Sequence, residues 1–127
     1  MTRRRTRASG KRRAAHRLGR WAETVCAAIF LTRGYRILAR RWRCPSGEID
    51  IVACRGATCV FVEVKARDRH ESAVEAVTPR QRLRIARAAE AFMAAHPGAG
   101  PEIRFDVMTV ASWRLPRHIV DAWRPER

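Results

Sequence analysis

Between residues 47 and 66 the sequence reads GEIDIVACRGATCVFVEVKA, two mostly apolar runs separated by a short break. Both runs are rich in Ile and Val, which are typical of strands, and Gly56 in the break tolerates the positive φ of a two-residue hairpin turn. The pattern therefore predicts a β-hairpin with Gly56 and Ala57 at its turn. Arg55 would then pair with Thr58, which sets the register of both strands.

The predicted register separates two faces of the hairpin. One face carries only aliphatic side chains and is expected to lie on the core. Its members are Ile49, Ile51, Ala53, Val60, Val62 and Val64. The other face is polar at one end, where Asp50 lies opposite Glu63 and Lys65 follows two residues later. The rest of that face is apolar, so we expect another element, the first helix, to cover it.

Asp50 and Glu63 are expected to oppose each other with Cβ atoms about 4.5 to 5.5 Å apart, where two carboxylates repel. A shared proton or a bound divalent cation would relieve the repulsion, and oxygen ligands favour Mg²⁺ or Mn²⁺. Lys65 would stabilise charge on a phosphate or help to deprotonate a water. It is one of two lysines among 27 basic residues, the other being Lys11. The ordinary alternative is a solvated strand face with one salt bridge.

Two helices are predicted around the hairpin. Apolar residues recur at three- and four-residue steps from Leu18 to Ile29, and Gly34 provides a stop. Thr78-Pro79-Arg80-Gln81 predicts the start of a second helix with a capping box, which ends near His96. The other segments are expected to be strands over 35–43 and 103–111, a loop over 67–77 and a last short element over 118–122.

The composition points to a polyanionic partner. The chain of 127 residues carries a formal net charge of +15 and a pI near 11.6, and such a field attracts polyanions such as nucleic acid or an anionic membrane. Residues 1–17 contain no acidic residue, which predicts a disordered basic tail followed by one domain over 18–127. The candidate nucleic-acid-binding residues are Arg3, Arg4, Arg5, Lys11, Arg12 and Arg13 in the tail, and Arg80, Arg84 and Arg87 on the second helix. A solubilising tail and an ordinary exposed helix are the alternatives.

The cysteines and the hydropathy bear on the compartment. Cys26, Cys44, Cys54 and Cys59 match no paired-ligand zinc spacing, and we expect reduced thiols that pack as small apolar residues. No stretch approaches the roughly 18 to 20 apolar residues that a membrane-spanning helix needs, and the apolar run after the tail is short for a signal peptide. These features predict a cytoplasmic protein outside the membrane.

The hairpin motifs, Gly47-Glu48-Ile49-Asp50 and the residues FVEVKAR at 61–67, resemble the core of the PD-(D/E)XK nuclease superfamily. More narrowly, the chain from Leu18 resembles the endonuclease-like YraN family, through GYRIL at 34–38 and RFDV at 104–107. The resemblance implies an α/β fold with a restriction-endonuclease-like αβββαβ core, in which helices flank a central mixed sheet.

The resemblance also implies roles for individual residues. Asp50 and Glu63 would bind Mg²⁺ or Mn²⁺, and Lys65 would act with them in catalysis. Glu23 matches the acid in the first helix that can complete the metal site in this family and in related Holliday junction resolvases. Asp106 belongs to a motif of the family, although a salt bridge with a neighbouring arginine explains it equally well. Gln81 loosely matches a position where relatives carry a polar or basic residue, but its role in helix capping explains it sufficiently.

The function implied is hydrolysis of phosphodiester bonds in DNA, including branched or damaged DNA. A junction-cutting enzyme would be expected to form a homodimer, because two strands must be cut symmetrically. The main alternative is a non-catalytic nucleic-acid-binding protein that retains the nuclease fold, with RNA as a further possible ligand. A third is an interaction module in which the tail, Trp113 and Trp123 contact an acidic partner, although aromatic residues of this kind more commonly anchor a core.

Overall fold

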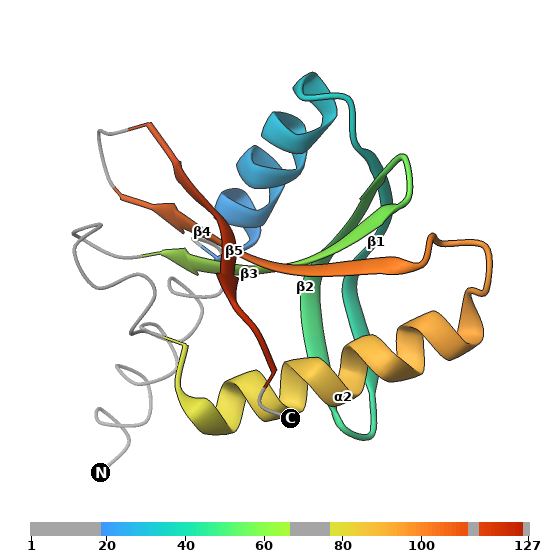
Figure 1. Ribbon diagram of the computed structural model, residues 1–127. Coiled ribbons are helices and arrows are strands. Elements are labelled where there is room, and N and C mark those ends of the chain that lie inside the picture. Colours follow the sequence, from blue (N-terminus) through green and yellow to red (C-terminus); the bar gives the residue numbers. More distant parts are fainter. Residues whose placement is uncertain (1–18, 67–76, 112–114, 126–127) are drawn as a thin grey trace, which may run out of the picture.

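The computed structural model describes residues 19–66, 77–111 and 115–125. Five strands form one sheet in the order β1-β2-β3-β4-β5 (Figure 1). The strands are β1 (Arg36–Cys44), β2 (Gly47–Arg55), β3 (Thr58–Ala66), β4 (Glu102–Val110) and β5 (Arg117–Trp123). Residues 19–32 form the blue helix of Figure 1, here called the first helix, and α2 spans Pro79–Ala95.

The sheet is mixed because of one parallel pair. β1, β2 and β3 pair antiparallel in sequence, and β4 and β5 pair antiparallel, whereas β3 and β4 are parallel. Parallel neighbours need a crossover connection, and α2 lies in it. The predicted order of a helix, three strands, a helix and a strand is therefore confirmed, with β5 added at the edge. The fold is α/β and is consistent with a restriction-endonuclease-like core.

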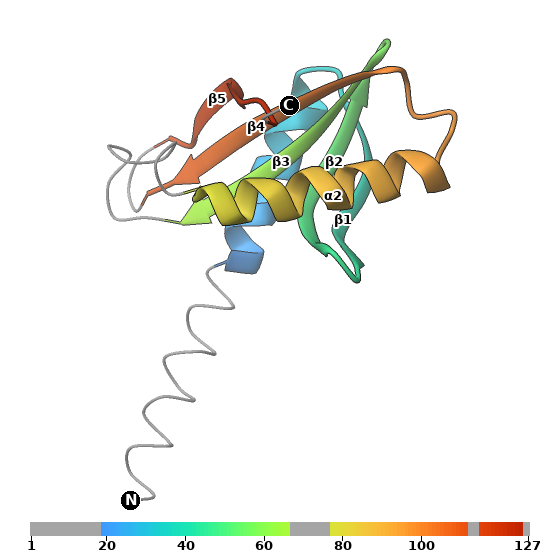
Figure 2. The ribbon, with the colours of Figure 1, turned by 60° about the horizontal axis from the view of Figure 1, so that its bottom comes forward.

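A helix covers each face of the sheet. In Figure 2 α2 crosses in front of the strands and the first helix lies behind them. One apolar cluster joins Phe92 of α2 to Val52 and Phe61. The other joins Phe30 of the first helix to Ile51 and Val62. The sheet is therefore the middle of three layers, and both of its faces are buried.

The structure confirms the hairpin register and corrects the assignment of its faces. Pairs run as predicted from Arg55 and Thr58 to Ile51 and Val62. The aliphatic face is not continuous, however, because Ile49 packs with the α2 cluster whereas Ile51 packs beneath the first helix. The first helix was expected to cover the partly polar face of the hairpin, but it covers the aliphatic face. The partly polar face is covered by α2.

The physical reason for the change of face lies in β1. Arg40 pairs with Ile51 and Trp42 pairs with Ile49, so Arg41 stands between these pairs. Arg41 has a φ of 50°, which interrupts the regular alternation of the strand. Trp42 and Ile49 both join the α2 cluster. A two-residue period cannot reveal such a turn in the backbone, which is why the prediction for Ile49 was wrong.

The helix boundaries agree with the sequence signals. The Thr78 hydroxyl accepts a hydrogen bond from the Gln81 amide at 3.2 Å, and the Gln81 side chain accepts one from the Thr78 amide at 3.0 Å. This capping box supplies partners for donors that the first helical turn leaves unpaired. Gly34, with a φ of 86°, follows the first helix as expected.

The structure also bears on the predictions for the cysteines, for Trp123 and for membrane-spanning helices. All four cysteines are free thiols, and Cys26, Cys54 and Cys59 are buried. Trp123 is buried and stacks on Phe105 with 4.2 Å between the ring centroids, so it anchors the core. None of the helices in the described ranges has the length and apolar character required to cross a membrane. The predicted tail over 1–17, Trp113 and the predicted loop, apart from residue 77, lie outside the described residues.

Candidate active site

The candidate centre lies where β2 and β3 stop pairing. The ladder of Cα partners ends at Ile51 and Val62. Beyond this pair, Oδ2 of Asp50 accepts a hydrogen bond from the amide of Val64 at 2.8 Å. A side-chain carboxylate therefore takes an N–H of β3 in the part of the hairpin where the regular ladder has ended. This bond holds Asp50 beside Glu63, as the sequence predicted, although the backbone pairing of these two residues is lost.

Lys65 lies next to Glu63, as their two-residue spacing on one strand predicted. The Lys65 Nζ is 3.4 Å from Oε1 of Glu63, and the side chains of Lys65 and Glu63 are only 15% and 17% exposed, respectively. The register predicted from Arg55 and Thr58 would place Glu48 opposite Lys65, but Glu48 instead forms an exposed ion pair with Arg43 at 3.3 Å. The ammonium of Lys65 is therefore paired with the carboxyl group of Glu63.

The two carboxyl groups carry unusual protonation properties. Burial and then the negative charge of Glu63 raise the pKa of Asp50 to about 8, although the hydrogen bond from Val64 lowers it. Burial also raises the pKa of Glu63 above its ordinary value, while the charge of Lys65 acts in the opposite direction. Without a bound cation, Asp50 therefore keeps its proton at neutral pH.

Glu23 of the first helix reaches the same region. Its charge contributes to the raised pKa of Asp50, and together with burial and Asp50 it raises the pKa of the Cys26 thiol to about 12. The Glu23 side chain is only 12% exposed, and its Oε1 lies 3.0 Å from Nε of Arg41. The structure thus brings Glu23 close to the centre but binds its carboxylate to an arginine.

The carboxyl groups at this centre meet part of what a divalent cation requires. No group of three or more His, Cys, Asp or Glu side chains in the described part of the chain is arranged to hold a metal ion. Mg²⁺, however, is commonly held by one or two carboxylates together with waters and substrate phosphates. Asp50 and Glu63 fit that pattern, because a cation would replace the proton that their mutual repulsion requires.

Arg41 is the residue at this centre that sequence reasoning missed. It lies among other arginines of β1, and nothing in the apolar pattern distinguishes it from Arg40 or Arg43. Its ion pair with Glu23 joins residues that are 18 positions apart, and its positive φ is a conformation that arginine rarely adopts. Only the folded structure reveals either property.

The three candidate arginines of α2 are all exposed and lie at spacings that place them on one side of the helix. They are Arg80, Arg84 and Arg87. Arg84 packs against the start of β2, since a Cβ added to Gly47 would lie 3.4 Å from the Arg84 Cβ. This contact connects the arginine side of α2 to the strand that carries Asp50. The six candidates in the tail lie outside the described residues.

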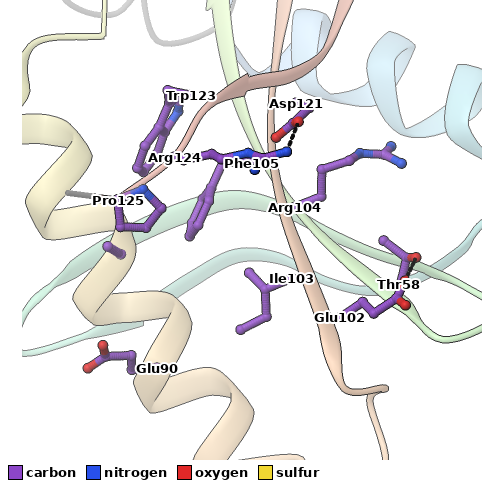
Figure 3. A pocket seen from close by; sticks show the side chains of 11 residues that line it. Thr58, Glu90, Glu102, Ile103, Arg104, Phe105, Asp121, Trp123, Arg124 and Pro125 are labelled. Carbon is purple, nitrogen blue, oxygen red and sulfur yellow. Dashed lines mark hydrogen bonds and ion pairs between the residues drawn. The ribbon is translucent and has the colours of Figure 1, made fainter. Parts of the chain in front are cut away.

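A hollow of about 1050 Å³ lies elsewhere, between α2, β4 and β5 (Figure 3). Ile103, Trp123 and Glu90 are among the residues that line it, whereas Asp50, Glu63 and Lys65 are not. The candidate centre is therefore identified by the charged side chains that meet there and not by the position of this hollow. Charged side chains within reach of an extended polyanion do not need an enclosed pocket.

Asp106 anchors a separate, buried network. Arg104 donates two hydrogen bonds of 2.8 Å to its carboxylate, and Nε2 of His118 lies 2.6 Å from Oδ2. The Asp121 amide donates a further bond of 2.9 Å. The sequence-based alternative, a salt bridge with a neighbouring arginine, is confirmed. Asp106 therefore ties β4 to β5, and its bonds account for its burial.

The raised pKa of Asp50 leads to a prediction for the metal-free protein. Because the folded state holds this proton up to about pH 8 and the unfolded chain releases it near 3.8, the contribution of Asp50 to stability falls as the pH rises between these values. Relative to Asp50→Asn, the wild type should lose roughly 3 to 4 kcal/mol between pH 5 and pH 8. Urea unfolding in EDTA measures this difference.

Glu90→Gln is the control, because it removes an exposed carboxylate on α2 whose charge does not contribute to the raised pKa of Asp50. The free energy of unfolding of this variant should change with pH in parallel with that of the wild type. Addition of Mg²⁺ at pH 8 should stabilise the wild type and not Asp50→Asn. Parallel pH profiles for the wild type and Asp50→Asn would show that Asp50 ionises normally.

The fold and the site together define a class: a restriction-endonuclease-like α/β protein with acidic and lysine side chains gathered where two central strands part. The chain belongs to the uncharacterised protein family UPF0102, whose family model matches residues 22–110.

Relatives with the same family name support this membership. A UPF0102 protein of Rhodopseudomonas palustris strain BisB5 is 54% identical over 114 residues, which cover 89% of this chain and 87% of the relative. One from Bradyrhizobium diazoefficiens is 53% identical over 117 residues, covering 91% and 88% of the two chains. One from Parvibaculum lavamentivorans is 47% identical over 113 residues, covering 88% and 85%. Their names describe the family and no activity.

Proposed function

We propose that this protein is a metal-dependent endonuclease that hydrolyses phosphodiester bonds in DNA. The observation that carries the proposal is the pair of half-buried carboxyl groups, Asp50 and Glu63, next to the ammonium of Lys65. A structural ion pair needs one acid and one base. A second buried carboxyl group beside the first costs free energy, because one of the two has to be protonated. A role in cation binding explains why both acids are present.

Asp50 and Glu63 hold Mg²⁺ or Mn²⁺ in this proposal. The Val64 amide fixes Oδ2 of Asp50, so the orientation of that carboxylate is set before a ligand arrives. A cation held by these residues would act as a Lewis acid on the phosphate and would favour deprotonation of a water. Lys65, held by Glu63, places a positive charge beside the reacting phosphate and can accept or donate a proton there.

The remaining positive charge supports binding of the polymer. Arg80, Arg84 and Arg87 are exposed on α2, and they add to a net charge of +15. Contacts between arginines and backbone phosphates give affinity without sequence preference and a steep dependence on salt. We propose DNA in preference to RNA, a cytoplasmic location, and a homodimer where both strands of a junction are cut.

The test is cleavage of labelled single-stranded, duplex, flap and four-way DNA and of duplex RNA, each with Mg²⁺, Mn²⁺ or EDTA. We expect cation-dependent cleavage of at least one DNA and its loss in Asp50→Asn, with binding retained. Equal cleavage by wild type and Asp50→Asn would place the activity outside this centre. Tight binding by the wild type with no cleavage of any substrate would support the non-catalytic alternative.

A further inference from the structure

Arg41 occupies a strained position directly across from the candidate centre. The pairs on either side of it, Arg40 with Ile51 and Trp42 with Ile49, place Arg41 opposite Asp50 in the register of β1 and β2. Its φ of 50° falls in the left-handed region, which a long side chain rarely adopts. Of the non-glycine residues in the described ranges, only Asp121 shares a positive φ. Such strain persists where the surrounding structure requires it, and it is concentrated at functional sites.

The strained backbone lets neighbouring side chains reach opposite layers of the molecule. Trp42 turns towards α2 and packs edge-on against Phe92, with 5.3 Å between ring centroids. Arg41 reaches the first helix on the other side of the sheet, where its Nε contacts Glu23. The backbone turn therefore allows a guanidinium to enter the region of Asp50 while the core on the α2 side stays filled.

The guanidinium is held and still available to a ligand. Its bond to Glu23 uses the Nε–H, and within the described residues its two Nη groups form no bond to another side chain or to the backbone. The Arg41 side chain is 34% exposed, compared with 12% for Glu23. A guanidinium oriented through one N–H, with free N–H groups directed elsewhere, suits the oxygens of a phosphate.

The contacts of Glu23 account for the orientation of the Arg41 guanidinium, and they do not indicate that Glu23 binds a metal ion. The Glu23 carboxylate already has a positively charged partner, because Nε of Arg41 lies 3.0 Å from its Oε1. The structure also lacks a third acidic side chain arranged with Asp50 and Glu63 as a metal-binding group within the described residues. Arg41 stands opposite Asp50 in the register of β1 and β2, so its ion pair with Glu23 lies beside the centre.

We propose that Arg41 binds the phosphate group that occupies the centre, and that Glu23 is a positioning residue that orients Arg41 and is not a ligand of the cation. This inference rests on the proposed function for the identity of the ligand, a nucleic-acid backbone phosphate. It adds a phosphate-binding residue from β1 to the acidic and lysine residues of β2 and β3. It also assigns Glu23 a different role from the one that family resemblance implies.

The test compares Arg41→Gly, Glu23→Gln and the control Arg43→Ala. Glycine adopts a positive φ without strain, so Arg41→Gly removes the guanidinium and preserves the backbone conformation. Arg43 lies two residues further along β1 in an exposed pair with Glu48, where its side chain is 74% exposed. Affinity for duplex and four-way DNA is measured by fluorescence anisotropy in Ca²⁺ across a salt series, and Mn²⁺ affinity is measured by electron paramagnetic resonance without DNA.

For DNA, Arg41→Gly should weaken binding by about tenfold and reduce the slope of log affinity against log salt by about one, whereas Arg43→Ala should change affinity by less than about twofold. Glu23→Gln should weaken binding by about threefold, since the guanidinium keeps its charge and loses its orientation. Equal effects of Arg41→Gly and Arg43→Ala on affinity and slope would overturn the phosphate contact.

For the metal, Glu23→Gln should change Mn²⁺ affinity by less than about threefold. A loss of more than about tenfold, which is at least the size typical when a hydrogen-bond partner of a metal ligand is removed, would overturn the assignment of Glu23 to Arg41 alone. Neither measurement depends on cleavage. If the wild type cuts no substrate but Arg41→Gly still binds DNA more weakly than the wild type, the nuclease proposal is contradicted and the phosphate contact is supported. If the wild type cuts DNA and Arg41→Gly binds DNA as tightly as the wild type, the nuclease proposal is supported and the phosphate contact is contradicted.

Discussion

Replacement of Lys65 by alanine is expected to slow metal-dependent DNA cleavage by at least about 100-fold, with less than about a threefold change in DNA affinity. Lys65 Nζ lies 3.4 Å from Glu63, and its side chain is largely shielded from water. A charge at such a position acts mainly on the phosphate that reacts, whereas exposed arginines supply most of the affinity for the polymer. Single-turnover cleavage and anisotropy on the same labelled DNA measure the two effects separately.

Lys65→Arg then separates two roles of the amine. Arginine keeps the positive charge but does not release its proton in proteins, and its guanidinium is larger and planar. A rate within about tenfold of the wild type would indicate that the charge is the main contribution. A rate as low as that of Lys65→Ala would indicate that proton transfer or the compact shape of the amine is required. Full activity of Lys65→Ala would contradict the assigned role altogether.

Asp106→Ala is expected to lower the free energy of unfolding by about 3 to 5 kcal/mol, because it removes the acid from a buried ion pair and leaves the base uncompensated. The Asp106 side chain is fully buried, and Arg104, its partner, is only 21% exposed. His118 and the Asp121 amide also lose their acceptor. Urea unfolding at pH 7 measures the change, with Asp121→Asn as a control because Asp121 forms an exposed pair with Arg124.

Asp106→Asn provides a milder variant in case the alanine variant does not fold. Burial by itself would raise the pKa of Asp106, but the bonds from His118, Arg104 and the Asp121 amide outweigh it and hold the pKa below its ordinary value of 3.8. The resulting stability is present above that value and is lost as the pH falls through the folded-state pKa. The wild type should therefore lose its advantage over Asp106→Asn on acidification below about pH 4. An advantage that stays constant from pH 4 to pH 2 would contradict this assignment, because a lowered folded-state pKa requires it to fall as the unfolded chain takes up the proton.

The part of the candidate site that could be predicted is the part that lies on one hairpin. Asp50, Glu63 and Lys65 are brought together by a turn at Gly56 and by the two-residue period of strands, both of which are local properties. Arg41 and Glu23 could not be paired in this way. Their contact joins a strand to a helix across the sheet, and it depends on one residue in a rare backbone conformation.

The sequence by itself determined the order of the elements, the register of the hairpin from Arg55 to Ile51, and the capped start of α2 at Thr78. Each of these follows from residues that are neighbours in the chain or that face each other across one turn. The tertiary structure alone decided which helix covers which face, the turn of Ile49 towards α2, the pairing of Arg41 with Glu23 and the burial of Asp106 among partners from β4 and β5. These features depend on contacts between distant segments, and local periodicity carries no information about which distant segments meet.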